Sequence, residues 1–355
     1  MAPLLTPTAV EATFAGMRDA ASTLVSKWTE SSQGLRTEAR DDLRRLNLEA
    51  AMLCLFDQRL DCISGPEPPV LKALDDVPFE CMQRPNRPKA LNWLLRGRLD
   101  GGTQVLRDFA AEVVAKRKSE KTEKRDMLHT LMHATDPESG KPLDEERVID
   151  EIVTLLIGTT TCPGLLSFSI FYLLHNPQAL EKAREEIDNL IGPNDPFTQA
   201  HVAKLPYCDA ILKESIRLSA AAPGFNIEPL PSSTPVTLAG GKYAIPPKQL
   251  IIAVLATVNR DPTVFAEPEA FRPERMLPEA FAKLPKGAQK WFGNGKRECI
   301  GKHYAWQWAM VTLGSVVRSV DLEMADPGYE MKMDGAFNLK PINFFVVAKP
   351  RAAAA

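Results

Sequence analysis

A run of 23 residues without a charged side chain, from Ile152 to Leu174, constrains the fold of this chain more than any other feature. A helix of about 20 apolar residues is long enough to cross a bilayer. The centre of this run, however, is the sequence GTTTCPG, in which Pro163 cannot donate a backbone hydrogen bond and therefore bends a helix. We interpret the run as the buried central helix of a large helical domain, and we predict no membrane span.

The composition of the 355 residues is that of an ordinary globular protein, with 45% hydrophobic and 25% charged residues. The formal net charge of −2 does not point to a nucleic-acid partner. We interpret the mixed-charge cluster from Lys116 to Arg125 as a solvated helix end or loop. Six scattered cysteines form no CxxC pair, and the first residues lack the pattern of a signal peptide, so we expect a cytoplasmic protein.

Apolar residues recur at helical spacing through most of residues 6–60. Further helices are predicted from about Thr103 to Arg117, near Lys124 to His133, from Pro177 onward and from about Lys302 to Val320. Beyond Pro223 the sequence predicts a hairpin turning at Gly240 and Gly241, then a buried strand, and final strands within 329–348. We therefore predict one mainly α-helical domain over residues 1–355 with a small β portion.

The sequence WFGNGKRECIGKHYAW, residues 291–306, places a single cysteine, Cys299, in a glycine-rich loop just before a predicted helix. A thiolate can act as a nucleophile, a redox group or a metal ligand. A nucleophile would need a base, and the only nearby imidazole is that of His303. As a metal ligand Cys299 can act alone if a cofactor fills the other coordination positions, as the porphyrin does in haem.

The neighbours of Cys299 suit a haem. Three glycines let the backbone approach a flat ring closely: Gly293, Gly295 and Gly301. The positive end of the following helix lies near the thiolate. Arg297 can form a charge-assisted bond with a haem carboxylate, and Phe292 can pack on the ring.

Residues 292–301 match the haem-binding signature F-x-x-G-x-R-x-C-x-G at every specified position, and the chain in this respect resembles the cytochrome P450 family. Further matches follow the family's order. Glu214-Ser-Ile-Arg217 is similar to the family's E-x-x-R, and the segment from Phe271 to Arg275 is similar to its F-x-P-E-R-F. In the family, this glutamate and the two arginines form a buried structural ion-pair network, and the alternative reading is a surface salt bridge.

The resemblance extends from about Leu5 to Pro350, and the sequence GLLSF in the apolar run is typical of the soluble fatty-acid hydroxylase branch, whose members are often fused to their reductase. It implies a P450-type helical fold and haem b, with Cys299 as the axial ligand. The implied function is that of a monooxygenase that hydroxylates or epoxidises a lipophilic small molecule. Electrons would come from NADPH through a separate reductase, since no flavin module follows Pro350.

The chain departs from the family's pattern at its start. Its first residues resemble the region after the family's third main helix, so we expect a fold without the usual N-terminal strands and first helices. An N-terminal membrane anchor preceding the chain would place it on the cytosolic face of the endoplasmic reticulum instead.

The second departure lies in the apolar run. Aligned through GLLSF, Thr161 falls on the family's oxygen-activating threonine, while Thr160 replaces the acid before it. Because threonine has no ionisable proton near neutral pH, this change also suits an isomerase, a dehydratase or a peroxide-using enzyme. A haem-free binding protein is a further alternative.

Two other sets of residues have simpler interpretations. His129 and His133 are four residues apart, as in zinc sites, but the glutamate of H-E-x-x-H is missing, which favours a surface helix. Cys162 beside the expected bend is interpreted as a buried structural cysteine.

Overall fold

The computed structural model describes residues 2–352, apart from 121, 123, 137, 138, 193, 194, 231–234 and 336. Its helices are α1 (Pro7–Glu11), α2 (Phe14–Trp28), α3 (Ala39–Phe56), α4 (Pro69–Gln83), α5 (Lys89–Leu94), α6 (Arg96–Ser119), α7 (Met127–Met132), α8 (Glu145–Thr159), α9 (Cys162–His175), α10 (Pro177–Leu190), α11 (Gln199–Val202), α12 (Pro206–Leu218), α13 (Leu255–Val258), α14 (Pro278–Ala282) and α15 (Lys302–Ser319). Short 3-10 helices are η1 (Ala2–Leu5), η2 (Arg84–Asn86), η3 (Pro273–Met276), η4 (Lys286–Gln289) and η5 (Gly295–Arg297).

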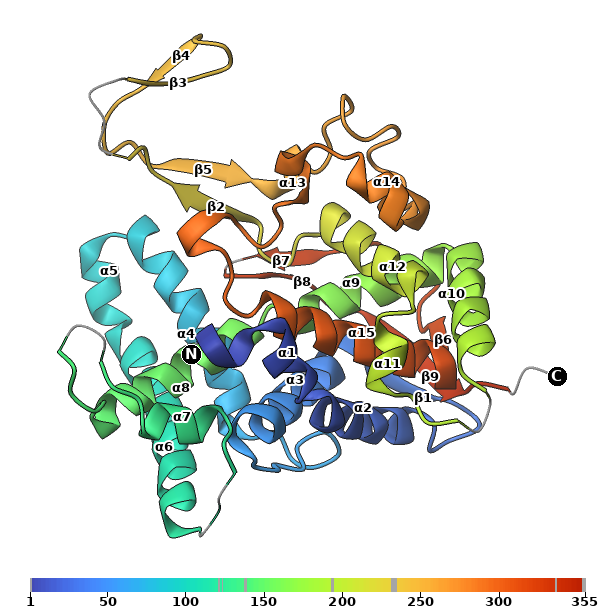
Figure 1. Cartoon of the computed structure of the whole chain (residues 1–355), viewed down its shortest axis with the longest axis horizontal. Coiled ribbons are helices and arrows are strands. Elements are labelled where there is room, and N and C mark those ends of the chain that lie inside the picture. Colours follow the sequence, from blue (N-terminus) through green and yellow to red (C-terminus); the bar gives the residue numbers. More distant parts are fainter. Residues whose placement is uncertain are drawn as a thin grey trace.

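The central element is α9, around which α3, α10, α12 and α15 pack (Figure 1). Nine consecutive residues of α9, from Cys162 to Ile170, are buried. A helix buried on all sides must be apolar around its whole circumference, which explains the uncharged sequence of this segment. The helical stretch from Glu145 to His175 is long and apolar enough to cross a membrane, but 61% of its most apolar window is buried inside the protein, as in the core helix of a globular domain.

This helical stretch is interrupted between Thr159 and Cys162, where α8 ends and α9 begins. Pro163 has no N–H to give to the carbonyl of Thr159, and the N–H of Thr160 bonds to the carbonyl of Ile157 at 3.1 Å. The hydrogen bond lost at Pro163 therefore coincides with the interruption of the helix at Thr160 and Thr161. Both residues keep right-handed helical backbone angles, with φ of −64° and −78°, so they form a tight turn between α8 and α9.

The β portion consists of small antiparallel sheets. Its strands are β1 (Leu35–Glu38), β2 (Gly224–Ile227), β3 (Val236–Leu238), β4 (Tyr243–Ile245), β5 (Ile251–Val254), β6 (Val320–Met324), β7 (Met333–Gly335), β8 (Leu339–Pro341) and β9 (Phe345–Pro350). The order of the three-stranded sheet is β1-β9-β6, and the pairs are β2–β5, β3–β4 and β7–β8. The sheet β1-β9-β6 joins the start of the chain to its end, a long-range pairing that the sequence did not predict.

Three predictions about elements need correction. The predicted buried strand is β5, but Ile252 and Val254 are exposed, because β5 pairs only with β2 among the described residues. Helix α6 begins at Arg96 rather than near Thr103, because α4 packs along it. The cluster from Lys116 to Arg125 is not wholly solvated, because Arg117 is buried against Asp126 with an N–O distance of 2.6 Å. Residues 121 and 123 of this cluster lie outside the described part of the chain.

Candidate functional site

The loop around Cys299 is held by the backbone rather than by side chains. The N–H of Cys299 donates to the carbonyl of Phe292 at 2.8 Å, which closes the loop on itself. Gly293 and Gly295 take φ angles of 82° and 62°, a region that side chains other than glycine's rarely adopt. Helix α15 starts at Lys302, so its N-terminal end lies beside the sulfur. The result is a thiol presented on an exposed loop of fixed shape.

The side chains next to Cys299 divide into two kinds. Arg297 is exposed and forms no hydrogen bond or ion pair with any residue that the structure describes. Phe292 is half-buried and packs edge-to-face on Trp306 of α15, with 6.1 Å between ring centroids. A Cβ placed on Gly301 would lie 4.0 Å from the sulfur of Cys299, so this position contacts the thiol directly. Arg297 is thus a free cation beside the thiol, and Phe292 anchors the loop to α15.

The electrostatics of the loop keep the free thiol protonated. Although Cys299 as a residue is exposed, its neighbours still remove water from around the sulfur, and this desolvation is the main cause that raises its pKa. A backbone hydrogen bond from Gly301 and the positive charge of Lys302 lower the pKa of Cys299, while the negative charge of Glu298 raises it further. Binding of a metal cation would release this proton, because the thiolate is the ligand.

The start of α9, at Cys162, is close enough to this loop for Cys299 to influence it electrostatically. Burial raises the pKa of Cys162 to about 12, and the neighbouring charge of Cys299 contributes to this rise. Cys162 is buried at the start of α9, as predicted for a structural cysteine. Gly158, one turn earlier, is exposed, and a Cβ there would meet no atom within 4 Å. The end of α8 is therefore open to solvent at Gly158.

Thr160 and Thr161 lie in the turn between α8 and α9 with different surroundings. The hydroxyl of Thr160 donates to the carbonyl of Ile157 at 2.8 Å, and Thr160 also lines a small cavity of about 20 Å³ that is shared with Asp75. Asn338, just before β8, donates its amide to the carbonyl of Thr160 at 2.9 Å. Thr161 is half-buried. The position that carries the family's acid thus holds a hydroxyl already engaged with the helix backbone.

Two asparagines that the sequence did not single out hold the turn from outside. Asn47 of α3 donates to the hydroxyl of Thr159 at 3.0 Å, and Asn338 binds Thr160 as described above. Both asparagines are buried, and no motif connects them with residues 159–161. No signal in a single sequence could have found them, because the contacts join residues more than 100 positions apart.

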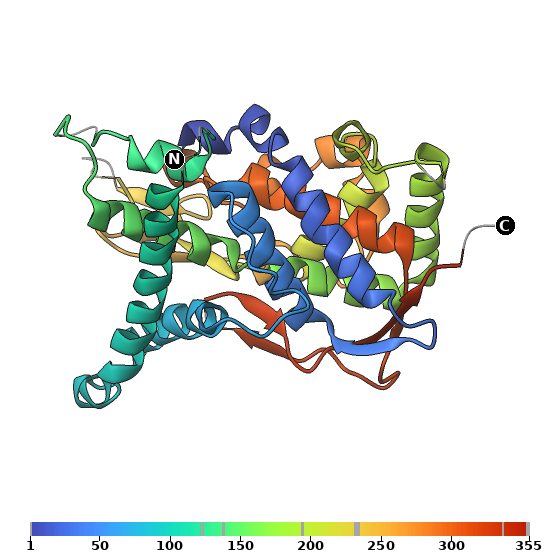
Figure 2. The same cartoon turned by 90° about the horizontal axis from the view of Figure 1, so that it is seen from below.

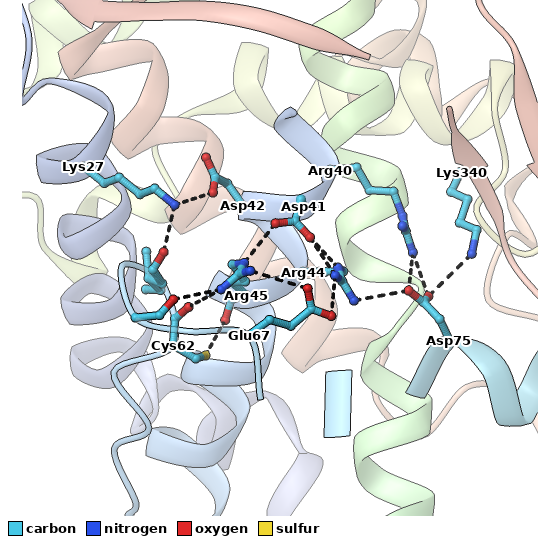
Figure 3. A network of polar contacts seen from close by, with 12 residues as sticks. Lys27, Arg40, Asp41, Asp42, Arg44, Arg45, Cys62, Glu67, Asp75 and Lys340 are labelled. Atoms are coloured by element: carbon cyan, nitrogen blue, oxygen red, sulfur yellow. Dashed lines mark hydrogen bonds and ion pairs between the residues drawn. The ribbon is translucent and has the colours of Figure 1, made fainter. Parts of the chain in front are cut away.

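Behind Thr160, a network of charges ties α3 and α4 to β8 (Figure 3). The carboxylate of Asp75 accepts two hydrogen bonds from Arg40, at 2.7 and 2.9 Å, and lies 3.5 Å from Lys340. Burial by itself would raise the pKa of Asp75, but these cations overcome it and hold the pKa below its ordinary value. Asp75 is therefore an ionised carboxylate whose charge is already satisfied.

Glu214 and Arg217 form the ion pair expected on α12. Both are fully buried, and two nitrogens of Arg217 lie 2.7 and 2.8 Å from the two carboxylate oxygens of Glu214. Arg275 of η3 adds an ion pair at 3.1 Å, and the Arg272 N–H donates to the same carboxylate at 2.9 Å. The remaining donors of Arg217 bind the carbonyls of Asn259, Pro268 and Ala270. The structure excludes the surface salt bridge as an alternative, because neither side chain reaches solvent.

The histidine pair lies apart from this site. The ring of His129, on the short helix α7, stacks on that of His133, the C-cap of this helix, with 4.2 Å between centroids. In the part of the chain that the structure describes, no group of three or more histidine, cysteine or acidic side chains is arranged to hold a metal ion.

Comparisons with known proteins agree with this geometry. The cytochrome P450 family model matches residues 1–347. The chain belongs to the cytochrome P450 family. Its fold is that of the P450 haem domain: the crystal structure of the cytochrome P450DA haem domain superposes with a TM-score of 0.88 at 27% identity, over 99% of this chain and 76% of that one.

Among curated proteins, the chain is similar to self-sufficient monooxygenases of fungi. It is 36% identical over 98% of its length to CYP505E4 of Penicillium freii, of which it covers 34%. It is 35% identical over 98% of its length to a bifunctional cytochrome P450/NADPH–P450 reductase of Aspergillus oryzae, of which it covers 32%. The chain therefore spans about a third of the length of these relatives.

Haem with a cysteine thiolate as iron ligand is the cofactor of this family, and the described residues fit it. Cys299 is the cysteine of the matching loop and is exposed. Arg297 is a cation without a partner among the described residues and suits a propionate group. Gly158 at the end of α8 has no side chain, and no other atom would lie within 4 Å of a Cβ at this position. These residues together would hold the haem.

Proposed function

We propose that this P450 chain is the haem-binding part of a monooxygenase that hydroxylates or epoxidises a lipophilic small molecule. The observation that carries the proposal is the exposed Cys299 thiol in a backbone-locked loop at the N-terminal end of α15. When bound, haem supplies the iron at which dioxygen is reduced and activated. The protein's own residues would position the ring and the substrate and would deliver protons.

The proposed role of each residue follows from its surroundings. Cys299 would bind the iron, Arg297 would bind a haem carboxylate, and Thr161 would pass a proton through its hydroxyl at the turn between α8 and α9. Phe337, an exposed apolar side chain next to Asn338, would favour an apolar substrate. The free cysteines and the ordinary composition support a cytoplasmic location.

Electrons would come from NADPH through a diflavin reductase. The relative from Aspergillus oryzae is named as a P450 combined with such a reductase. Residues 286–302 carry five cations and only one acid, and that acid, Glu298, is already paired with Lys302 at 2.8 Å. This basic surface next to Cys299 would attract an acidic reductase domain, whether it is a separate protein or part of a longer chain.

One observation favours a second candidate, a P450-fold enzyme that rearranges its substrate or uses peroxide. Thr160 replaces the family's acid, and its hydroxyl is bound to the carbonyl of Ile157. The nearby carboxylate of Asp75 is held ionised by Arg40 and Lys340. An enzyme that starts from peroxide needs no proton delivery of the kind that dioxygen requires.

The first experiment is the absorption spectrum of the reduced protein under carbon monoxide. The red-shifted Soret band of a thiolate-ligated carbonyl is expected in the unchanged protein and in Cys81→Ser, a matched change of another exposed cysteine. It should be absent in Cys299→Ala. No Soret absorption in protein produced with added haem would contradict the proposal and favour a haem-free binding protein.

A second experiment separates the two candidates. Turnover is compared with NADPH, reductase and dioxygen on the one hand and with peroxide on the other. If Thr160→Glu leaves oxygen-dependent turnover at zero while peroxide-dependent turnover continues, the monooxygenase proposal is wrong. A rise of oxygen-dependent turnover in Thr160→Glu, with less peroxide released per NADPH, supports it.

A further inference from the structure

A small cavity lies where α3 and α4 pack against the turn between α8 and α9. We call it the Asp75 cavity; its volume is about 20 Å³, and its wall includes Asn47, Asp75 and Thr160. A cavity needs about 10–15 Å³ and at least two polar partners to hold one water molecule. An amide, a carboxylate and a hydroxyl in the wall meet the second condition, as the volume meets the first. The Asp75 cavity is therefore suited to one ordered water.

Asn47 gives an independent reason to place a water there. Its side-chain nitrogen donates to the hydroxyl of Thr159 at 3.0 Å. Its side-chain oxygen is buried and accepts no hydrogen bond from the residues that the structure describes. A buried oxygen without a donor is unfavourable, and such groups are usually satisfied by ordered water. A water in the Asp75 cavity would supply the donor.

The carboxylate of Asp75 can bind this water as well. A carboxylate can accept about four hydrogen bonds. Its two short ones come from a single nitrogen of Arg40, at 2.7 and 2.9 Å, while Arg44 and Lys340 each lie 3.5 Å away (Figure 3). Because these cations hold its pKa below the ordinary value, Asp75 does not retain a proton at neutral pH. It can take a proton from solvent and release it to a neighbouring water.

Asp75 also connects the cavity with solvent. Its side chain is 23% exposed. It lines a second cavity, of about 10 Å³, together with Phe79 and Phe337, which are both exposed. Figure 2 shows α4, in light blue, next to the red β7–β8 hairpin at the lower edge of the molecule. Asp75 therefore lies between the surface and the turn that carries Thr160.

This arrangement gives the acid that is absent at position 160 a counterpart in space. Monooxygenation consumes one dioxygen, two electrons and two protons, and it yields one water and one oxygen atom inserted into the substrate. We propose, on the basis of the function proposed above, that Asp75 replaces the missing acid from α4. A water in the Asp75 cavity joins its carboxylate to the hydroxyl of Thr160, and protons pass from solvent along this route toward Thr161. Asp75 is thus a positioning residue, because it acts through the water.

The first test does not depend on activity. It is a crystal structure of the haem-loaded protein at a resolution that shows ordered water. We expect one water within hydrogen-bond distance of the Asp75 carboxylate, the side-chain oxygen of Asn47 and the Thr160 hydroxyl. A dry cavity, or a water that contacts neither Asp75 nor Thr160, would overturn the proposal.

The second test measures proton delivery with dodecanoic acid as the apolar probe substrate, NADPH and a soluble reductase. Asp75→Asn should release at least fivefold more hydrogen peroxide per NADPH and show a larger solvent deuterium isotope effect on oxygen-dependent turnover. Turnover driven by added peroxide should change less than twofold. Asp334→Asn is the control, because Asp334 lies 3.6 Å from Lys340 but is 43% exposed. An unchanged Soret band and circular dichroism spectrum would show that each variant is folded.

A rescue separates proton delivery from a structural role. Asp75→Asn combined with Thr160→Asp moves the carboxylate across the cavity, and peroxide release should fall back toward that of the original protein. Peroxide release that Asp75→Asn does not change, or that the double variant does not restore, would show that only the route through Asp75 is wrong. Oxidation of the probe with peroxide but never with dioxygen in the original protein would instead refute the proposed monooxygenase function.

Discussion

At the scale of single residues, the position most sensitive to substitution is Glu214 in its buried ion-pair network, not Cys299 in the exposed loop. Glu214 is fully buried and is bound by Arg217 and Arg275, so three charges share one dry site. Burying charges is unfavourable unless each has its partners, and removal of one partner exposes the full desolvation cost of the others. Cys299, in contrast, is held by backbone geometry and can be exchanged without leaving a buried charge.

Glu214→Gln should therefore destabilise the protein strongly. We expect the free energy of unfolding to fall by about 3–5 kcal/mol, because Arg217 would remain buried without a counter-charge. Urea denaturation followed by tryptophan fluorescence measures this change. Glu269→Gln is the control, since its pair with Arg260 is exposed on the glutamate side and should contribute at most about 1 kcal/mol. Equal effects of the two substitutions would refute a buried network.

At the scale of elements, the turn between α8 and α9 depends on contacts from α3 and from the β7–β8 hairpin. The turn leaves helix carbonyls without their usual N–H partners, and a buried carbonyl without a donor is costly. Asn338 supplies such a donor to Thr160 at 2.9 Å. The shape of the central helix is thus decided jointly by Pro163 and by an amide from another part of the chain.

Asn338→Ala should reduce the free energy of unfolding by about 1 kcal/mol, the typical contribution of one buried hydrogen bond. Asn338→Asp should cost more, because a carboxylate cannot donate and would face the Thr160 carbonyl. Both values come from urea titrations. If the alanine variant proved as stable as the original protein, the amide would have no part in holding the turn.

The charge network of Figure 3 gives the second prediction at this scale. The pKa of Asp75 lies below that of an unfolded aspartate, about 3.9, so Asp75 contributes stability above that pH and loses it as the pH falls through its lower folded pKa. Asp75→Asn should cost about 2 kcal/mol at pH 7, and the difference from the original protein should shrink in acid. Unfolding free energies measured from pH 7 downward show this convergence.

A matched control for Asp75 is Asp334→Asn, since Asp334 lies 3.6 Å from Lys340 but is 43% exposed. Its effect should be small at every pH. A difference between Asp75→Asn and the original protein that stays constant into acid would show that the carboxylate is not held ionised by Arg40 and Lys340.

At the scale of the whole molecule, charge is unevenly distributed although the chain is nearly neutral. One group of basic residues surrounds the cysteine loop within residues 286–302, and another lies within residues 84–98 around α5. The two lie on different elements, and so they can serve different partners. Long-range electrostatic attraction accelerates association without changing the fold.

Lys290→Glu combined with Lys296→Glu should slow reduction of the haem by a soluble NADPH–P450 reductase by about tenfold at low ionic strength, and the difference should vanish in high salt. Stopped-flow absorption under carbon monoxide measures this rate. Lys242→Glu, at the turn between β3 and β4, is the control and should leave the rate unchanged. A rate that does not respond to Lys290 and Lys296 would place the reductase on another surface.

The sequence by itself determined the features that depend on neighbours along the chain. The apolar run required a buried helix, Pro163 required a bend, and the spacing from Phe292 to Gly301 indicated a thiolate loop before a helix. Glutamate and arginine three residues apart indicated a pair on one helix face, which the distances between Glu214 and Arg217 show. These inferences hold because hydrogen-bond geometry and helix periodicity act over a few residues.

Only the tertiary structure decided the features that join distant segments. The pairing of β1 with β9, the contact of Asn338 with Thr160 and the contact of Arg117 with the carbonyl of Phe56 each join residues brought close by packing. It also decided which apolar residues remain outside: Trp93 and Ile252 have the composition of core residues, yet both are exposed. Exposure depends on what the rest of the molecule covers, and a pattern along the sequence carries no information about that.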